Sequence, residues 1–218
     1  MFRRFRDRVE AGRELGEALG QYAGRPHLLV LALPRGGVPV GWEIAQRLQA
    51  PLDLLVVRKL GVPGHPELAM GAIASGGGRV LNEDILEGLG IGADVVARVE
   101  REEAEELRRR EAAYRGDRPP IRVHGRTIIL ADDGIATGAT MRAGVLALQQ
   151  RDPAAVVVAT PVASAPACAE LAHEVEVVCL ETPEPFRGVG AWYERFEQVS
   201  DEEVRVILAR SFAEQRAA

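Results

Sequence analysis

The chain has 218 residues, 47% of them hydrophobic, a size that allows one good core with an appendage or at most two small domains. A formal charge of -5 argues against a nucleic-acid binder, because no lysine or arginine face is free of interleaved glutamates. No apolar run is long enough to span a bilayer and no apolar signal core follows the N-terminus, so we expect a cytoplasmic protein with no membrane partner.

The first elements predict a βαβ unit. Residues 7–22 carry apolar side chains at helical spacing and predict an amphipathic helix. The continuous apolar run at 28–33 is typical of a strand buried on both faces, and helical periodicity resumes at 38–48. A second apolar strand at 52–57 completes a right-handed unit.

Glycine and proline are dense in the next segment. Residues 60–81 contain two short apolar stretches, which predict a hairpin with a flexible tip. Residues 82–115 form a helical segment that is broken near 88–92. Glu-Arg pairs at i, i+4 spacing in its second half favour a solvated helix face.

The second half alternates strands with helices and ends in an aromatic tail. An apolar strand ending at residue 131 precedes a helix at 139–150, and later strands are expected at 155–160 and 175–180 around a helix at 164–173. This alternation predicts an α/β fold. The tail gathers Phe186, Trp192, Tyr193 and Phe196 and a capping box for a last helix, so we divide the chain into a core at 1–181 and a tail at 182–218.

Two acids and a loop of small residues follow the strand that ends at residue 131. That strand would deliver Asp132 and Asp133 to the carboxyl edge of the sheet, where ligands bind in open α/β folds. The next residues would place backbone N–H groups and a helix dipole around one point, which suits a dianionic phosphate. They are Ala136, Thr137, Gly138, Ala139 and Thr140. Acids beside a phosphate suit vicinal ribose hydroxyls with Mg²⁺ nearby, so the stretch predicts a ribose 5-phosphate site.

The sequence Asp-Asp-Gly-Ile-Ala-Thr-Gly-Ala-Thr at 132–140 resembles the signature of the type I phosphoribosyltransferases, which binds 5-phosphoribosyl 1-diphosphate (PRPP). The resemblance implies an open, mainly parallel twisted sheet with helices on both faces, a glycine-rich hairpin insertion and a hood, for which we nominate the aromatic tail. It also implies a transferase of nucleotide metabolism that uses Mg²⁺. Residues 33–40 and 188–196 further resemble a bacterial group of predicted phosphoribosyltransferases whose acceptor is unknown.

In this family a loop after the first strand binds pyrophosphate through backbone amides. The residues at that position are Arg35, Gly36 and Gly37, which could otherwise form an ordinary glycine-cushioned turn. Similar enzymes place a basic residue near the leaving pyrophosphate after the next strand. We favour Lys59 over Arg58 there, because Lys59 is the one lysine among 27 basic residues.

The resemblance also implies roles for the charged residues. Asp132 and Asp133 would hold the 2′ and 3′ hydroxyls of ribose and would act on Mg²⁺ indirectly, through water or those hydroxyls. Lys59 and Arg35 complete the catalytic set, since they would stabilise the departing pyrophosphate.

The sequence does not identify the acceptor molecule. In relatives that act on 6-oxopurines, an aspartate proposed as general acid or base usually precedes the Thr-Gly pair, and here that residue is Ala136. Trp192 or Tyr193 could stack on an acceptor base, although packing of the tail onto the core is the commoner explanation for such aromatics. The expected partners are PRPP and a small-molecule acceptor, and a homodimer would suit the family. A regulator that binds PRPP or a nucleotide without turnover, and a phosphosugar hydrolase, stay open as alternatives.

Overall fold

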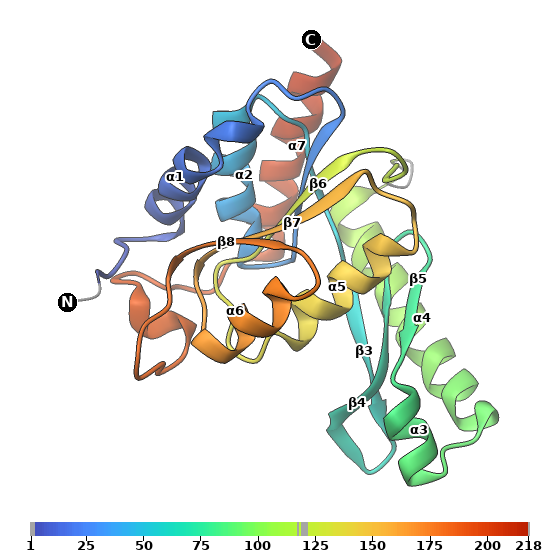
Figure 1. Ribbon diagram of the computed structural model, residues 1–218. Coiled ribbons are helices and arrows are strands. Elements are labelled where there is room, and N and C mark those ends of the chain that lie inside the picture. The colour runs from blue at the N-terminus through green and yellow to red at the C-terminus, as the bar shows by residue number, and fades with distance from the viewer. Residues whose placement is uncertain (1–2, 117, 119–121, 218) are drawn as a thin grey trace.

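Five parallel strands form the central sheet of the computed structural model, which describes residues 3–116, 118 and 122–217 (Figure 1). Their order across the sheet is β2-β1-β6-β7-β8. In that order the strands cover Leu52–Leu54, Leu28–Ala32, Thr127–Ala131, Ala155–Val162 and Glu176–Glu181. Each neighbouring pair is parallel, so the carboxyl ends of the strands lie along one edge.

Helices cover both faces of this sheet because the strands are apolar on both sides. In β1, Val30 and Ala32 pack in one cluster with the first, second and last helices, whereas Leu29 and Leu31 pack in another with the two helices that follow β6 and β7. These helices are α1 (Arg8–Ala18), which continues into the short turn η1 (Gly20–Tyr22), α2 (Gly37–Leu48), α7 (Asp201–Ala217), α5 (Ala139–Gln149) and α6 (Ala165–Ala172). The predicted open, mainly parallel α/β fold is confirmed.

A second sheet, with three antiparallel strands, stands beside the central one. Its strands are β3 (Val57–Val62), β4 (His65–Ala74) and β5 (Gly78–Leu81). Helix α5 contacts all three strands, and the long helix α4 (Ala93–Arg115) contacts β3 and β4. Figure 1 shows the β3–β4 end of this sheet and the short helix α3 (Glu83–Leu89) projecting away from the central sheet. None of the described helices is both long and apolar enough to cross a membrane.

The prediction of a single strand at 52–57 is wrong, because the chain passes from the central sheet to the second sheet within these residues. Strand β2 ends at Leu54, and the Leu55 N–H still donates to the Ala32 carbonyl of the central sheet. At Val56 the carbonyl accepts instead from the Ser75 N–H at the end of β4. Lys59 therefore lies inside β3 of the second sheet, rather than in a loop at the carboxyl edge of the central sheet.

The N-terminal segment and the C-terminal tail lie side by side. Phe5 and Tyr193 form a parallel β-bridge just after the short turn η2 (Val189–Trp192). The Phe5 N–H donates to the Trp192 carbonyl at 2.9 Å, and the Glu194 N–H donates to the Phe5 carbonyl at 2.8 Å. The tail is thus fastened to the opposite end of the chain, and the division into a core at 1–181 and a tail at 182–218 stays a prediction.

Candidate active site

The acid pair lies at the carboxyl end of β6, next to the loop that follows β1. The two segments meet because β1 and β6 are neighbours in the sheet. A Cβ atom built on Gly36 would lie 1.9 Å from Oδ2 of Asp133, and one built on Gly37 would lie 2.8 Å from the carbonyl oxygen of Ala131. Only glycine permits this close approach. The structure therefore brings the loop expected to bind pyrophosphate against the acids expected to bind ribose.

Residues 136–140 form the end of the loop between β6 and α5 together with the first two residues of α5, and most of them are exposed. Gly138 is the N-cap residue of α5 and has a φ of 77°, a conformation that favours glycine. The Ser164 hydroxyl donates a 2.6 Å hydrogen bond to the Ala136 carbonyl, which ties the loop to the start of α6. Because the first turn of a helix leaves N–H groups without intrahelical partners, this loop can bind an anion.

The pKa values of both acids are raised above the ordinary value for aspartate. Burial raises the pKa of Asp132 well above its ordinary value, and the charge of Asp133 adds to the rise. The Asp133 N–H donates a 2.9 Å hydrogen bond to Oδ1 of Asp132, which acts in the opposite direction on that pKa. Burial also raises the pKa of Asp133, and the guanidinium of Arg8 opposes that rise. Ligand groups that donate hydrogen bonds to these carboxylates would stabilise their ionised forms.

The sequence did not predict the arginine that pairs with Asp133. Arg8 begins α1, and its Nε atom lies 2.8 Å from Oδ2 of Asp133, with the two side chains only 12% and 14% exposed. A cation in the first turn of a helix is unfavourable next to the positive end of the helix dipole. The position of Arg8 at the start of the predicted helix is therefore the one sequence feature that indicates a specific anionic partner.

Arg35 lies in the loop after β1 and faces the C-terminal helix. Its guanidinium is 3.7 Å from Oδ1 of Asp201, the first residue of α7. The same carboxylate oxygen accepts a 2.8 Å hydrogen bond from the Tyr114 hydroxyl of α4. The Pro34–Arg35 peptide bond is cis. Since the Arg35 side chain is 37% exposed, it can exchange this weak ion pair for a ligand oxygen.

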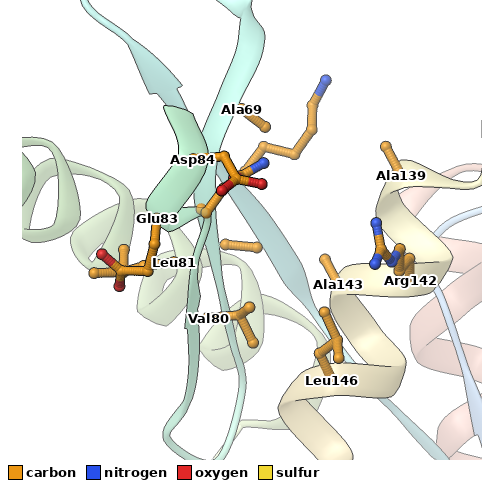
Figure 2. Close-up of a pocket in the computed structure, with 13 residues that line it drawn as sticks. Ala69, Val80, Leu81, Glu83, Asp84, Ala139, Arg142, Ala143 and Leu146 are labelled. Carbon is orange, nitrogen blue, oxygen red and sulfur yellow. The ribbon is translucent and has the colours of Figure 1, made fainter. Parts of the chain in front are cut away.

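Lys59 lines a cavity of about 420 Å³ between the second sheet and α5 (Figure 2). Figure 2 shows Val80 of the sheet on one side of this cavity and Ala139 and Arg142 of α5 on the other. Of the described residues, 13 line the cavity and Arg35 is not among them. Lys59 thus lines the same cavity as Ala139 at the start of α5, and Oε2 of Glu67 lies 4.0 Å from its Nζ.

The two aromatic residues expected near the acceptor are packed to different degrees. The ring of Tyr193 is 1% exposed and lies between Phe5 and Phe196, at centroid distances of 5.8 and 5.0 Å. Its hydroxyl donates a 2.6 Å hydrogen bond to the carbonyl of Asp133. Trp192 is half-buried in the neighbouring turn. Tyr193 offers no open ring face for a base, and packing of the tail onto the acid loop accounts for its position.

The described residues contain no group of three or more His, Cys, Asp and Glu side chains that could hold a metal ion. Asp132 and Asp133 are two carboxylates at one edge of the sheet, beside loops suited to phosphate oxygens. Mg²⁺ is commonly bound through one or two carboxylates, several waters and substrate phosphates, and these residues fit that arrangement.

Comparison with known proteins identifies the family. The profile of the phosphoribosyl transferase domain matches residues 7–194, so the chain belongs to this family, and the resemblance noted at 132–140 is confirmed. A relative from two strains of Mycobacterium tuberculosis, provisionally named a phosphoribosyl transferase, is 48% identical over 208 residues. The match covers 95% of this chain and 47% of that protein, so the chain spans about half the length of these curated relatives.

Solved structures share the fold. The crystal structure of TT1426 from Thermus thermophilus is 44% identical, with a TM-score of 0.87 over 95% of this chain and 98% of that chain. A hypothetical protein from Neisseria gonorrhoeae is 12% identical, with a TM-score of 0.51 over 96% of this chain and 99% of that chain. At that identity the second likeness shows the fold alone.

Proposed function

We propose that this protein transfers ribose 5-phosphate from PRPP to a nitrogenous small molecule and releases pyrophosphate. The observation that carries the proposal is the contact between Gly36 and Asp133, because it unites a glycine-rich loop with an acid pair beside the N-terminus of α5. Membership of the phosphoribosyl transferase domain family supports the same activity.

The ribose 5-phosphate half would be bound by β6 and the loop that follows it. Asp132 and Asp133 would accept hydrogen bonds from the 2′ and 3′ hydroxyls, which are neutral donors suited to two adjacent carboxylates. The 5-phosphate would lie against the N–H groups at 136–140, with the hydroxyls of Thr137 and Thr140 as further donors.

The pyrophosphate half would lie over the loop after β1. The amides of Gly36 and Gly37 and the guanidinium of Arg35 would bind its oxygens once Arg35 leaves Asp201. Lys59 would approach from the second sheet, on the α5 side. Asp132 and Asp133 would hold Mg²⁺ indirectly, through water or the ribose hydroxyls, and the ion would supply positive charge against the pyrophosphate.

The chemistry would consist of bond cleavage at C1 of ribose with little covalent help from the protein. The C1–O bond to pyrophosphate loosens, its electron pair leaves with pyrophosphate, and positive charge develops on the ribose ring. The nearby carboxylates favour that charge. The acceptor nitrogen then donates its lone pair to C1 and passes its proton to the departing pyrophosphate or to water, so atoms and charge balance. Positioning and electrostatics therefore supply most of the rate enhancement.

We infer that the acceptor is not a 6-oxopurine. Ala136 stands where such enzymes usually have an aspartate, and an alanine can neither donate nor accept a proton. The ring of Tyr193 is packed against Phe5 and Phe196, so it is not available to stack on an acceptor base. Trp192 is half-buried and would lie at the edge of the acceptor site.

A thermal-shift titration with PRPP and Mg²⁺ tests the site. We expect PRPP to raise the Tm of the wild type by mass action, and we expect Asp133→Asn and Thr137→Val to abolish that rise while the fold stays intact. Asp152→Asn and Thr182→Val change exposed residues away from the site and should respond like the wild type. Unchanged PRPP stabilisation in both site variants would refute the assignment.

Pyrophosphate release separates the three possible activities. A transferase releases pyrophosphate from PRPP only when a suitable acceptor from a panel of amines and nucleobases is present. A hydrolase releases it with no acceptor added, and a regulator binds PRPP without releasing it at all.

A further inference from the structure

Arg8 is fixed over the acid pair by contacts on several sides. Its Nε atom donates to Oδ2 of Asp133 at 2.8 Å, and its Nη1 atom donates to the Glu197 carbonyl at 2.8 Å. Its guanidinium carbon lies 4.0 Å from the ring centroid of Phe196. A guanidinium that uses two donor edges and one face is held in a single orientation.

The segments that carry these contacts are themselves fastened together. Phe5, three residues before Arg8, is bonded through its backbone to Trp192 and Glu194 of the tail. The Tyr193 hydroxyl donates to the Asp133 carbonyl at 2.6 Å, so the tail contacts the acid loop directly. Arg8 therefore belongs to a clasp, defined as residues 5–8 together with 192–197, that closes over Asp133.

We propose, on the basis of the proposed PRPP site, that Arg8 is a positioning residue that orients Asp133 to bind the ribose diol. Arg8 holds Oδ2 of the carboxylate, and Gly36 packs so closely against the same carboxylate that a Cβ atom there would lie 1.9 Å from Oδ2. Oδ1 is then directed to accept a ribose hydroxyl, because a carboxylate has lone pairs on both oxygens. The role would be specific to ribose, since the proposed site places pyrophosphate over the loop after β1.

Charge gives a second reason for this arrangement. Asp133 is 14% exposed and directly follows another carboxylate, and Arg8, itself 12% exposed, places a guanidinium 2.8 Å from its Oδ2. Among the described residues, the titratable groups that interact with Asp133 are Arg8 from α1, Asp132 from its own loop and Tyr193 from the tail, and of these three only Arg8 is a cation. Lysine would supply the charge but could not combine two fixed donor edges with a stacked face.

Isothermal titration with three ligands tests this role. Wild type, Arg8→Met, Arg8→Lys and the control Arg13→Met, which removes an exposed arginine of the same helix, would each be titrated with PRPP, ribose 5-phosphate and pyrophosphate in the presence of Mg²⁺. We expect Arg8→Met to weaken PRPP and ribose 5-phosphate binding at least about tenfold while pyrophosphate binding stays within about twofold of wild type. Arg8→Lys should show the same pattern with a smaller loss, and Arg13→Met should match wild type.

Other outcomes overturn the inference in distinct ways. Equal losses for all three ligands would mean that Arg8 only supports the fold, and tighter PRPP binding in Arg8→Met would mean that Arg8 blocks the site. Unchanged ribose 5-phosphate binding would remove the positioning role. If Arg8→Met does not fold, the same comparison is decided by Arg8→Lys. Failure of the wild type itself to bind PRPP and ribose 5-phosphate would instead reject the proposed function, and the role of Arg8 with it.

Discussion

Gly36 and Asp133 occupy adjoining space, so that a Cβ atom on Gly36 would lie 1.9 Å from Oδ2 and 2.5 Å from Cγ of Asp133. Gly36 has ordinary right-handed dihedral angles, with a φ of -61°, so its backbone conformation does not require glycine. The carboxylate does, because it fills the volume that a methyl group would need. The loop after β1 and the acid pair after β6 are consequently one packed unit.

Gly36→Ala should therefore disable the site without unfolding the protein. The new methyl group must displace Asp133, because the carboxylate is also held by Arg8 and cannot simply rotate away. We expect PRPP affinity to fall at least about tenfold and the free energy of unfolding to fall by about 1–3 kcal/mol, as is typical of overpacking. Thermal shift with and without PRPP measures the first quantity, and urea denaturation measures the second.

Gly88→Ala is the matched control for that variant. Gly88 lies within α3, and a Cβ atom there would meet nothing within 4 Å. The substitution should leave PRPP binding unchanged and raise helix stability slightly. A Gly36→Ala protein that keeps the full PRPP response would show that Asp133 is not needed in its present position.

Ser164→Ala should loosen the phosphate loop. Ser164 caps α6 by accepting from the Ala167 N–H at 3.3 Å, and it donates to the Ala136 carbonyl at 2.6 Å. We expect a loss of about 1 kcal/mol from the cap, together with weaker binding of ribose 5-phosphate, measured by calorimetry.

Ser200→Ala separates these two effects. Ser200 makes a comparable capping bond at 3.1 Å to the Glu203 N–H, at the start of α7 rather than beside the phosphate loop. Its loss should destabilise the protein by a similar amount and leave ribose 5-phosphate affinity unchanged. Equal ligand effects in both variants would argue against a role for the Ser164 hydroxyl in ordering the loop.

The sequence predicted the central sheet well because the signals there are local. A continuous apolar run identifies a strand buried on both faces, as at β1 and β6, and alternation with helices makes such strands parallel. Parallel strands bring their following loops to one edge, so the acids and the glycine loop were expected there. What local patterns could not supply is that β1 and β6 are direct neighbours, which creates the Gly36–Asp133 contact.

Two features escaped prediction for a physical reason. An apolar run such as 52–57 suits either sheet, so nothing in it marks the change of sheets at Leu55 and Val56. Arg8 is one of four arginines in the first eight residues, and its carboxylate partner lies 125 positions away. That contact depends on how α1 and the tail pack over the sheet edge, which hydrophobic periodicity does not encode.

The buried ion pair between Arg115 and Asp53 should affect the free energy of unfolding much more than an exposed ion pair does. Arg115 at the end of α4 lies 2.6 Å from Oδ2 of Asp53 on β2, and its side chain is 2% exposed. Asp53→Asn removes the nearer of the two carboxylates that pair with Arg115, the other being Glu111 at 3.5 Å, so it should lower the free energy of unfolding by up to about 3–5 kcal/mol in urea denaturation. Arg205→Met breaks an exposed pair on α7 and should change it by less than about 1 kcal/mol. Similar small losses in both variants would show that the buried pair is replaceable.

Asp201→Asn should strengthen pyrophosphate binding. Asp201 attracts Arg35 across 3.7 Å, and that partner must be given up before Arg35 can bind a pyrophosphate oxygen. Asparagine keeps an oxygen that can accept from the Tyr114 hydroxyl but removes the charge, so the packing of α4 against α7 should survive. Because exposed ion pairs contribute about 0.2–1 kcal/mol, we expect pyrophosphate affinity measured by calorimetry to rise by a factor of about 1.4 to 5. Glu202→Gln removes the adjacent charge, which pairs with Arg205, and should leave that affinity unchanged. A weaker affinity in Asp201→Asn would mean that Asp201 orients Arg35 for pyrophosphate instead of competing with it.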